Sequence, residues 1–228
     1  MKILFNYKNH SLMNADLPIG KPNISLCKEN SDKINDMHIF YNYPNMYDTE
    51  IEYLENTSNS YINTGLKGKA SLKIETDWLF KVSEVAGIMG ASYNHAPNYA
   101  LLYRANSGTS SYFYVSSYYG ISALTLNKKW NIIMDKGKLY YDNVLKKGAT
   151  VSGDSTYNFM LFKAADYGTG VKGQLFKCKI WDNDTLVRDY IPVKKNNIGY
   201  LFDKVSGQLY GNAGGGSFVC GPDLNISN

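Results

Sequence analysis

The stretch Trp130-Asn-Ile-Ile-Met-Asp-Lys-Gly-Lys-Leu-Tyr-Tyr-Asp-Asn-Val-Leu145 decides the fold class of this chain. An apolar segment led by a tryptophan is followed by turn formers at 135–137, and a second strand-like segment occupies 138–141. Asp142 and Asn143 form another turn before the apolar chain resumes. Because Gly and Asn tolerate the positive φ that tight turns need, the stretch predicts two consecutive β-hairpins.

The composition favours an antiparallel all-β protein. The 228 residues include 20 Tyr and 20 Gly but only 6 Pro. Aromatic residues suit pleated, half-buried surfaces, and Gly supplies turns. Each Tyr can belong to a sheet face or to the edge of the core, or it can contribute to an exposed recognition surface.

Short strand-like segments follow one another from Ile51 onward, separated by Gly, Asn, Asp and Ser. No segment of ten or more residues shows a clear 3.6-residue periodicity. This spacing predicts two antiparallel sheets packed as a jelly-roll sandwich. The predicted strands are 51–55, 61–64, 71–80, 85–92, 99–104, 111–115, 129–135, 138–141, 157–163, 173–181, 185–193, 199–202, 208–210 and 217–220.

Several motifs carry a family resemblance. The hairpins of 130–145, the strand-like segment 173–183 and the opening segments 51–55 and 61–65 resemble laminin-G-like, concanavalin-A-like jelly rolls. Such domains occur in phage structural proteins of gut bacteria, and the likeness covers about residues 18–222. The resemblance implies an all-β, two-sheet antiparallel jelly roll. That scaffold hosts both lectins and glycosidases, so it names no reaction.

The first 49 residues differ from the rest. They hold three of the six prolines, many Asn and apolar bursts too short to build a core. Gly20–Cys27 and Met37–Asn42 resemble a lead-in hairpin that precedes jelly rolls in phage-derived proteins. We therefore predict an N-terminal arm at 1–49, a jelly roll at 50–222 and a tail at 223–228. The arm either attaches the protein to other virion proteins and to further copies, as a homo-oligomer, or packs on its own domain.

Charge and cysteine content argue against several classes. A net charge of +4 with scattered lysines does not indicate nucleic-acid binding. Three cysteines without a Cys-x-x-Cys motif do not predict a disulfide framework or a zinc site, and no cofactor is expected. Cys178, inside a strand-like segment, is expected to be a small buried apolar residue.

No apolar run approaches the roughly 20 residues that span a membrane. The first residues lose their hydrophobicity too early for a signal peptide. We therefore expect a virion protein, made in the host cytoplasm and carried outside in the particle.

An acidic motif, Glu50-Ile-Glu52-Tyr-Leu-Glu55, resembles the catalytic strand of laminarinase-type glycosidases. Their mechanism needs two carboxyl groups about 5 to 5.5 Å apart. The motif falls at the opening strand of the domain, its middle acid is Glu rather than Asp, and no Trp-rich strand flanks it. We therefore predict no catalytic residues and expect the three glutamates at a strand-edge surface.

Laminin-G-like domains often hold calcium at the sandwich rim, which makes Asp182-Asn-Asp184 the best local cluster for a metal. A hairpin turn, in which Asp and Asn bond to their own backbone, explains the same residues more simply. No metal site is assigned.

Two Tyr-rich segments, 92–99 and 112–119, suggest carbohydrate contact. Sugars offer an apolar ring face and a belt of hydroxyls, which suit flat aromatic rings together with amide and guanidinium groups. In a strand, alternate residues share a face, so one face could meet the core while the other is exposed. The predicted carbohydrate-binding residues are Tyr93, Asn94, Asn98, Tyr99, Arg104, Tyr112 and Tyr114.

These observations predict a non-enzymatic phage virion component, such as a head fibre, capsid decoration or tail-fibre-associated protein, which binds host-surface glycans. Two other classes stay open. One is a glycan-binding module of a bacterial surface protein, and the other is a laminarinase-like glycoside hydrolase.

Overall fold

The computed structural model describes the backbone of residues 23–27, 38–42, 46–92, 99–105, 109–115, 117–121 and 124–224. It describes the side chains of 46–92, 111, 113, 119–121 and 124–224. The chain forms two compact units, residues 1–46 and 47–228. In the first unit, β1 (Asn23–Cys27) pairs antiparallel with β2 (His38–Asn42), and the rest of this unit, Met46 excepted, lies outside the described residues.

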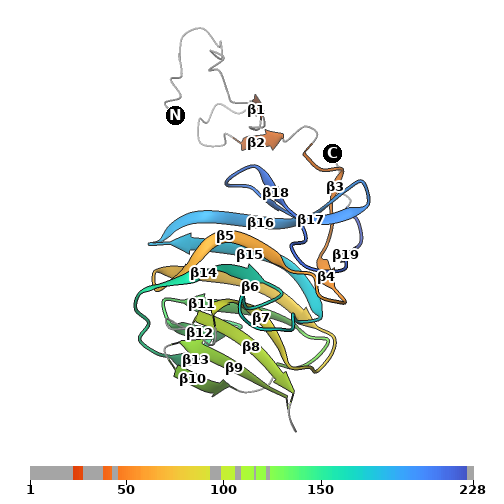
Figure 1. The fold of residues 1–228 in the computed structure, drawn as a ribbon. Helices are drawn as coiled ribbons and strands as arrows, with labels where there is room; N and C mark the ends of the chain where they lie inside the picture. Colours follow the sequence, from red (N-terminus) through yellow and green to blue (C-terminus); the bar gives the residue numbers. More distant parts are fainter. Residues whose placement is uncertain are drawn as a thin grey trace. The chain divides into compact units, whose positions relative to one another are not determined.

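The second unit is a sandwich of two sheets (Figure 1). The smaller sheet has the order β10-β9-β8-β7-β14-β5, formed by β5 (Ile62–Lys69), β7 (Ala86–Ser92), β8 (Tyr99–Ala105), β9 (Thr109–Val115), β10 (Ser117–Ile121) and β14 (Asp154–Leu161). The larger sheet has the order β13-β12-β11-β6-β15-β16-β17-β18, with β3, β4 and β19 paired beside it. Its strands are β3 (Thr49–Glu50), β4 (Leu54–Asn56), β6 (Leu72–Phe80), β11 (Lys129–Asp135), β12 (Lys138–Tyr141), β13 (Val144–Gly148), β15 (Gly173–Asp182), β16 (Thr185–Lys195), β17 (Ile198–Asp203), β18 (Gln208–Tyr210) and β19 (Phe218–Cys220).

Neighbouring strands of both sheets pair antiparallel, so the predicted all-β, two-sheet antiparallel sandwich is confirmed. The described residues contain no helix, and hence none that is long and apolar enough to cross a membrane.

The two hairpins predicted from 130–145 are present. Lys136 (φ 47°) and Gly137 (φ 86°) connect β11 to β12, and Asp142 (φ 50°) and Asn143 (φ 63°) connect β12 to β13. Gly137 is required for space as well as for φ, because a Cβ there would lie 2.2 Å from a backbone oxygen. Two-residue turns with positive φ match the twist of the paired strands, so these local residues set the register of three strands.

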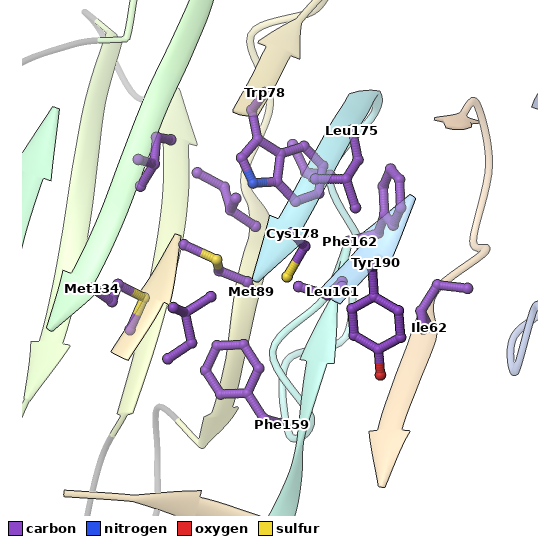
Figure 2. Close-up of a cluster of buried hydrophobic side chains, with 14 of the residues drawn as sticks. Ile62, Trp78, Met89, Met134, Phe159, Leu161, Phe162, Leu175, Cys178 and Tyr190 are labelled. Carbon is purple, nitrogen blue, oxygen red and sulfur yellow. The ribbon is translucent and has the colours of Figure 1, made fainter. Parts of the chain in front are cut away.

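The core lies between the inner faces of the sheets (Figure 2). Strand β6 is buried at every second residue, which is the period of a strand with one face toward a core. Its Trp78 is fully buried and stacks on Phe80 with ring centroids 5.9 Å apart. Cys178 is buried as predicted, and burial raises the pKa of its thiol.

Two predicted strands differ from the structure at the points given below, and strand β10 was not predicted. The strand expected at 51–55 is interrupted, because Glu52 N–H donates to the Pro222 carbonyl, away from the pairings of β3 and β4. The strand expected to end at residue 163 ends at Leu161, because Phe162 takes a positive φ of 68°. Strand β10 was missed, since its Ser and Gly residues suggested a loop.

A buried carboxylate stabilises the turn after β17. Asp203 is fully buried and accepts hydrogen bonds from Asp189 N (2.8 Å), Val205 N (3.1 Å), Ser206 N (3.2 Å) and Ser206 Oγ (2.6 Å). Asp203→Ala leaves these donors unpaired. We expect it to lower the free energy of unfolding by about 2 to 4 kcal/mol, measured by urea denaturation.

Asp184→Ala provides the control, because Asp184 lies in another turn and its carboxylate is exposed. Removing an exposed ion pair should change the free energy of unfolding by less than about 1 kcal/mol. An Asp203→Ala protein as stable as the Asp184→Ala protein would contradict this role.

Candidate functional site

The outer face of the smaller sheet, opposite the core, is the candidate site. One row of directly paired residues crosses all six strands of this sheet, in the order Asn63, Met160, Gly90, Ala100, Tyr114 and Tyr118. The sequence neighbours of Met160 are buried in the core, as is Phe113 beside Tyr114. Because strand residues alternate between faces, Met160 and Tyr114 occupy the outer face, and the row lies on that face at both positions.

The predicted carbohydrate-binding residues fall into two groups. Tyr93, Asn94 and Asn98 lie outside the described residues. The structure describes the backbone but not the side chains of Tyr99, Arg104, Tyr112 and Tyr114. Their positions in the sheet follow from the strand register alone.

The strand register places two of these Tyr positions on the outer face of the sheet and a third on the opposite face. Tyr112 and Tyr114 flank the buried Phe113 in β9 and therefore occupy the outer face. Tyr99 pairs with Val115, which shares the face of Phe113. The register thus places Tyr99 on the core side of the sheet, opposite the other two Tyr positions.

Arg104 and Tyr118 complete the outer-face positions of these strands. Arg104 pairs with Ser110, which shares the face of Tyr112, and Tyr118 pairs with Tyr114. Tyr118 was not among the predicted residues, because the strand that carries it was not predicted.

An amide pair occupies the other end of the row. Asn158 Nδ2 donates to Asn63 Oδ1 at 3.2 Å, and Gly65 N–H donates to the same oxygen at 3.0 Å. Strand alternation could have predicted Asn63 as an outer-face residue, since a strand was predicted at 61–64. Its pairing with Asn158 could not, because the two residues are 95 positions apart.

The segment 162–171 runs beside β7 at the edge of this region. The Gly87 N–H donates to a carbonyl of this segment at 2.9 Å, and Ser92 Oγ donates to Asp166 Oδ2 at 2.8 Å. A Cβ at Gly87 would lie 2.4 Å from the nitrogen of Ala164, so only glycine permits this close approach. The segment is therefore held against β7 by its backbone as well as by a side chain.

The three glutamates of the acidic motif lie in different environments. Glu50 ends β3 and accepts a hydrogen bond from the Tyr47 hydroxyl at 3.1 Å, while Glu52 is exposed between β3 and β4. Glu55 lies in β4. Two carboxyl groups that share a substrate must face one cleft, and these residues do not share a strand.

The expectation that all three glutamates lie at a strand-edge surface is wrong for Glu55, which is buried. Its exposed fraction is 9%, and its Oε2 accepts hydrogen bonds from Gln174 Nε2 at 2.7 Å and from Lys81 Nζ at 3.1 Å. Pairing of β4 with β15 brings Gln174 to this carboxylate, a contact between residues 119 positions apart.

The acidic rim cluster is a hairpin turn, as its simpler interpretation predicted. Asn183 (φ 48°) and Asp184 (φ 63°) connect β15 to β16. Asp182 lies 2.8 Å from Lys69 Nζ, and Asp184 lies 2.8 Å from Lys136 Nζ. Lysine ammonium groups thus occupy both carboxylates. Within the described residues, no group of three or more His, Cys, Asp or Glu could hold a metal ion.

Hydrogen bonds from Lys69 Nζ and then from Ser71 Oγ hold the pKa of Asp182 below its ordinary value. The resulting stabilisation is present above the unfolded-state pKa, about 3.9, and is lost as pH falls through the folded pKa. Lys69→Met should raise the pKa of Asp182 toward its ordinary value, as measured by NMR titration of the carboxyl carbon. Lys138→Met, which removes a lysine with no carboxylate partner among the described residues, should leave it unchanged.

No protein-family model and no curated protein matches the chain. Among solved structures, it is similar to a candidate carbohydrate-binding protein from Bacteroides ovatus, with a TM-score of 0.53 and 13% identity. The match covers 77% of this chain and 61% of that protein, so the chain spans about three fifths of the neighbour's length. The likeness shows a shared β-sandwich fold. It identifies neither a laminin-G-like family nor a phage origin.

Proposed function

We propose that the sandwich is a non-enzymatic carbohydrate-binding module and that the outer face of its smaller sheet contacts the ligand. The row across this sheet carries the proposal, because it joins the positions of Tyr114 and Tyr118 to the amide pair of Asn63 and Asn158. Aromatic rings suit the apolar face of a sugar, and amides suit its hydroxyls. The fold shared with a candidate carbohydrate-binding protein supports the same function.

This support favours a glycan-binding module over a virion component. A role in a phage particle stays a prediction, as do attachment through the arm, a homo-oligomeric state and a host-surface glycan as ligand. Each aromatic contact would contribute only about 1 kcal/mol, so a single site is weak and depends on many displayed copies. A particle or a cell surface would supply such copies.

The first test measures binding of the full chain, biotinylated and assembled on streptavidin, to a glycan array. Tyr112→Ala with Tyr114→Ala should weaken binding about tenfold or more, because two stacking contacts are lost and several sites act together. Tyr140→Ala is the control, since Tyr140 is half-buried in β12 of the other sheet. Equal loss in both variants, or no binding by the wild-type multimer, would reject the proposed face.

The second test addresses catalysis. Because Glu55 is buried against Gln174 and Lys81 while Glu52 is exposed, we expect no release of reducing ends from any polysaccharide that the protein binds. Reducing-sugar assays with wild type and Glu52→Gln should give the same background. Hydrolysis that Glu52→Gln abolishes would establish a glycosidase instead.

A further inference from the structure

The segment that follows β14 lies over the outer face of β7. Ala86 and Ile88 of β7 are buried in the core, so alternation along the strand turns Gly87 toward the outer face. A Cβ built at Gly87 would lie 2.4 Å from the Ala164 nitrogen, which places Ala164 above that face. Ala164 is fully buried although it is not a member of the core cluster, as expected for a residue covered by its own loop. Residues 164–167 therefore form a ridge on the outer face.

The ridge stands between the two groups of polar positions in the proposed site. In the sheet order, β7 separates β9 and β10, which carry the Tyr positions, from β14 and β5, which carry the amide pair. The Ala165 N–H donates to the Gly90 carbonyl at 3.3 Å, and Gly90 is a member of the row that crosses the sheet. A ligand that contacts both groups must pass over the ridge and meet its side chains.

Asp166 is the only charged residue of the ridge. The Tyr167 N–H donates to the Ala164 carbonyl at 3.0 Å, which closes a turn around Asp166. Asp166 is half-buried, and its Oδ2 accepts a hydrogen bond at 2.8 Å from the hydroxyl of Ser92, a fully buried residue. A backbone turn and a buried hydroxyl thus hold this carboxylate at a defined position at the end of β7.

A carboxylate at this position suits one kind of sugar. An ionised carboxylate is an acceptor only, and its two oxygens carry about four lone-pair sites, of which the Ser92 hydroxyl takes one. Two hydroxyls on neighbouring ring carbons can both donate to it, and such charge-assisted hydrogen bonds are stronger than neutral ones. A carboxylate or sulfate at the same place on the sugar would instead meet a like charge.

We infer that Asp166 contacts the ligand of this face and that the ligand is a glycan with two neighbouring free hydroxyls and no acidic group beside them. The inference rests on the proposed carbohydrate-binding function and adds the residue that selects the sugar. The Tyr positions and the amide pair contact the ligand on either side of the ridge, while Asp166 accepts hydrogen bonds from the hydroxyl pair. Sugars with a substituted or acidic group at this place bind more weakly.

The test is a ligand-detected NMR titration of the full chain with methyl glycosides, which measures weak single-site affinities. The probes are the methyl glycosides of glucose, galactose and mannose, their 3-deoxy and 4-deoxy forms, and methyl glucuronide. With wild type, loss of one hydroxyl of the pair should weaken binding about tenfold, and the glucuronide should bind less tightly than the glucoside. With Asp166→Ala, the parent glycoside should bind about as weakly as the deoxy form binds to wild type. The deoxy form should then lose nothing further, because its acceptor is gone.

Asp166→Asn keeps the shape of the side chain and removes its charge. It should weaken binding of the neutral glycosides and narrow their difference from the glucuronide. Asp184→Asn is the charge-matched control, because Asp184 lies in an exposed turn between β15 and β16 of the larger sheet, and it should change neither quantity.

Two results would overturn the inference. One is binding of neutral glycosides that Asp166→Ala and Asp166→Asn leave unchanged, and the other is tighter binding of the glucuronide than of the glucoside by wild type. The proposed function would stand in either case if that binding still needs Tyr112 and Tyr114. Absence of glycan binding by the wild-type multimer on the array would reject the proposed function and the inference together.

Discussion

The contact between Trp78 and Phe162 supports both the core and the candidate face. The two rings meet edge to face with centroids 4.8 Å apart, and the ring of Phe218 in β19 lies 4.9 Å from that of Phe162. Phe162 has a φ of 68°, a conformation that is costly for a bulky side chain. Burial of its ring offsets that cost. The turn at Phe162 then directs the following segment along β7, so the residue that fills the core also sets the border of the outer face.

The outer faces of the two sheets carry different sets of polar residues. On the larger sheet, some lysines pair with acids on a neighbouring strand, as Lys177 does with Glu75. The smaller sheet instead places Tyr positions, an amide pair and the unpaired Lys67 on its outer face. Aromatic rings and amides are the groups that the proposed carbohydrate contact needs. The Tyr positions and the amide pair are the physical basis for choosing the smaller sheet.

Local chemistry made much of the fold predictable. Gly137 and Asn143 adopt the positive φ that their residue types tolerate, so the hairpins of 130–145 followed from neighbours in sequence. The strand predicted at 71–80 is likewise present as β6, and its residues are buried at every second position. Glu55 shows the limit, because its burial depends on Gln174 and Lys81, which pairing of distant strands brings to it. Nothing near Glu55 in the sequence indicates that contact.

The sequence by itself determined the all-β class, most strand positions, the tight turns and the concentration of Tyr between residues 93 and 119. These features depend on backbone preferences and on a two-residue period, both of which act over a few residues. Only the tertiary structure decided that Asn63 and Asn158 meet, that the positions of Tyr99 and Tyr114 lie on opposite faces of the sheet, and that Lys67 donates to the Thr156 carbonyl. Register and strand order arise from burial of one face against residues far away in the chain, and a one-residue shift would reverse every side chain.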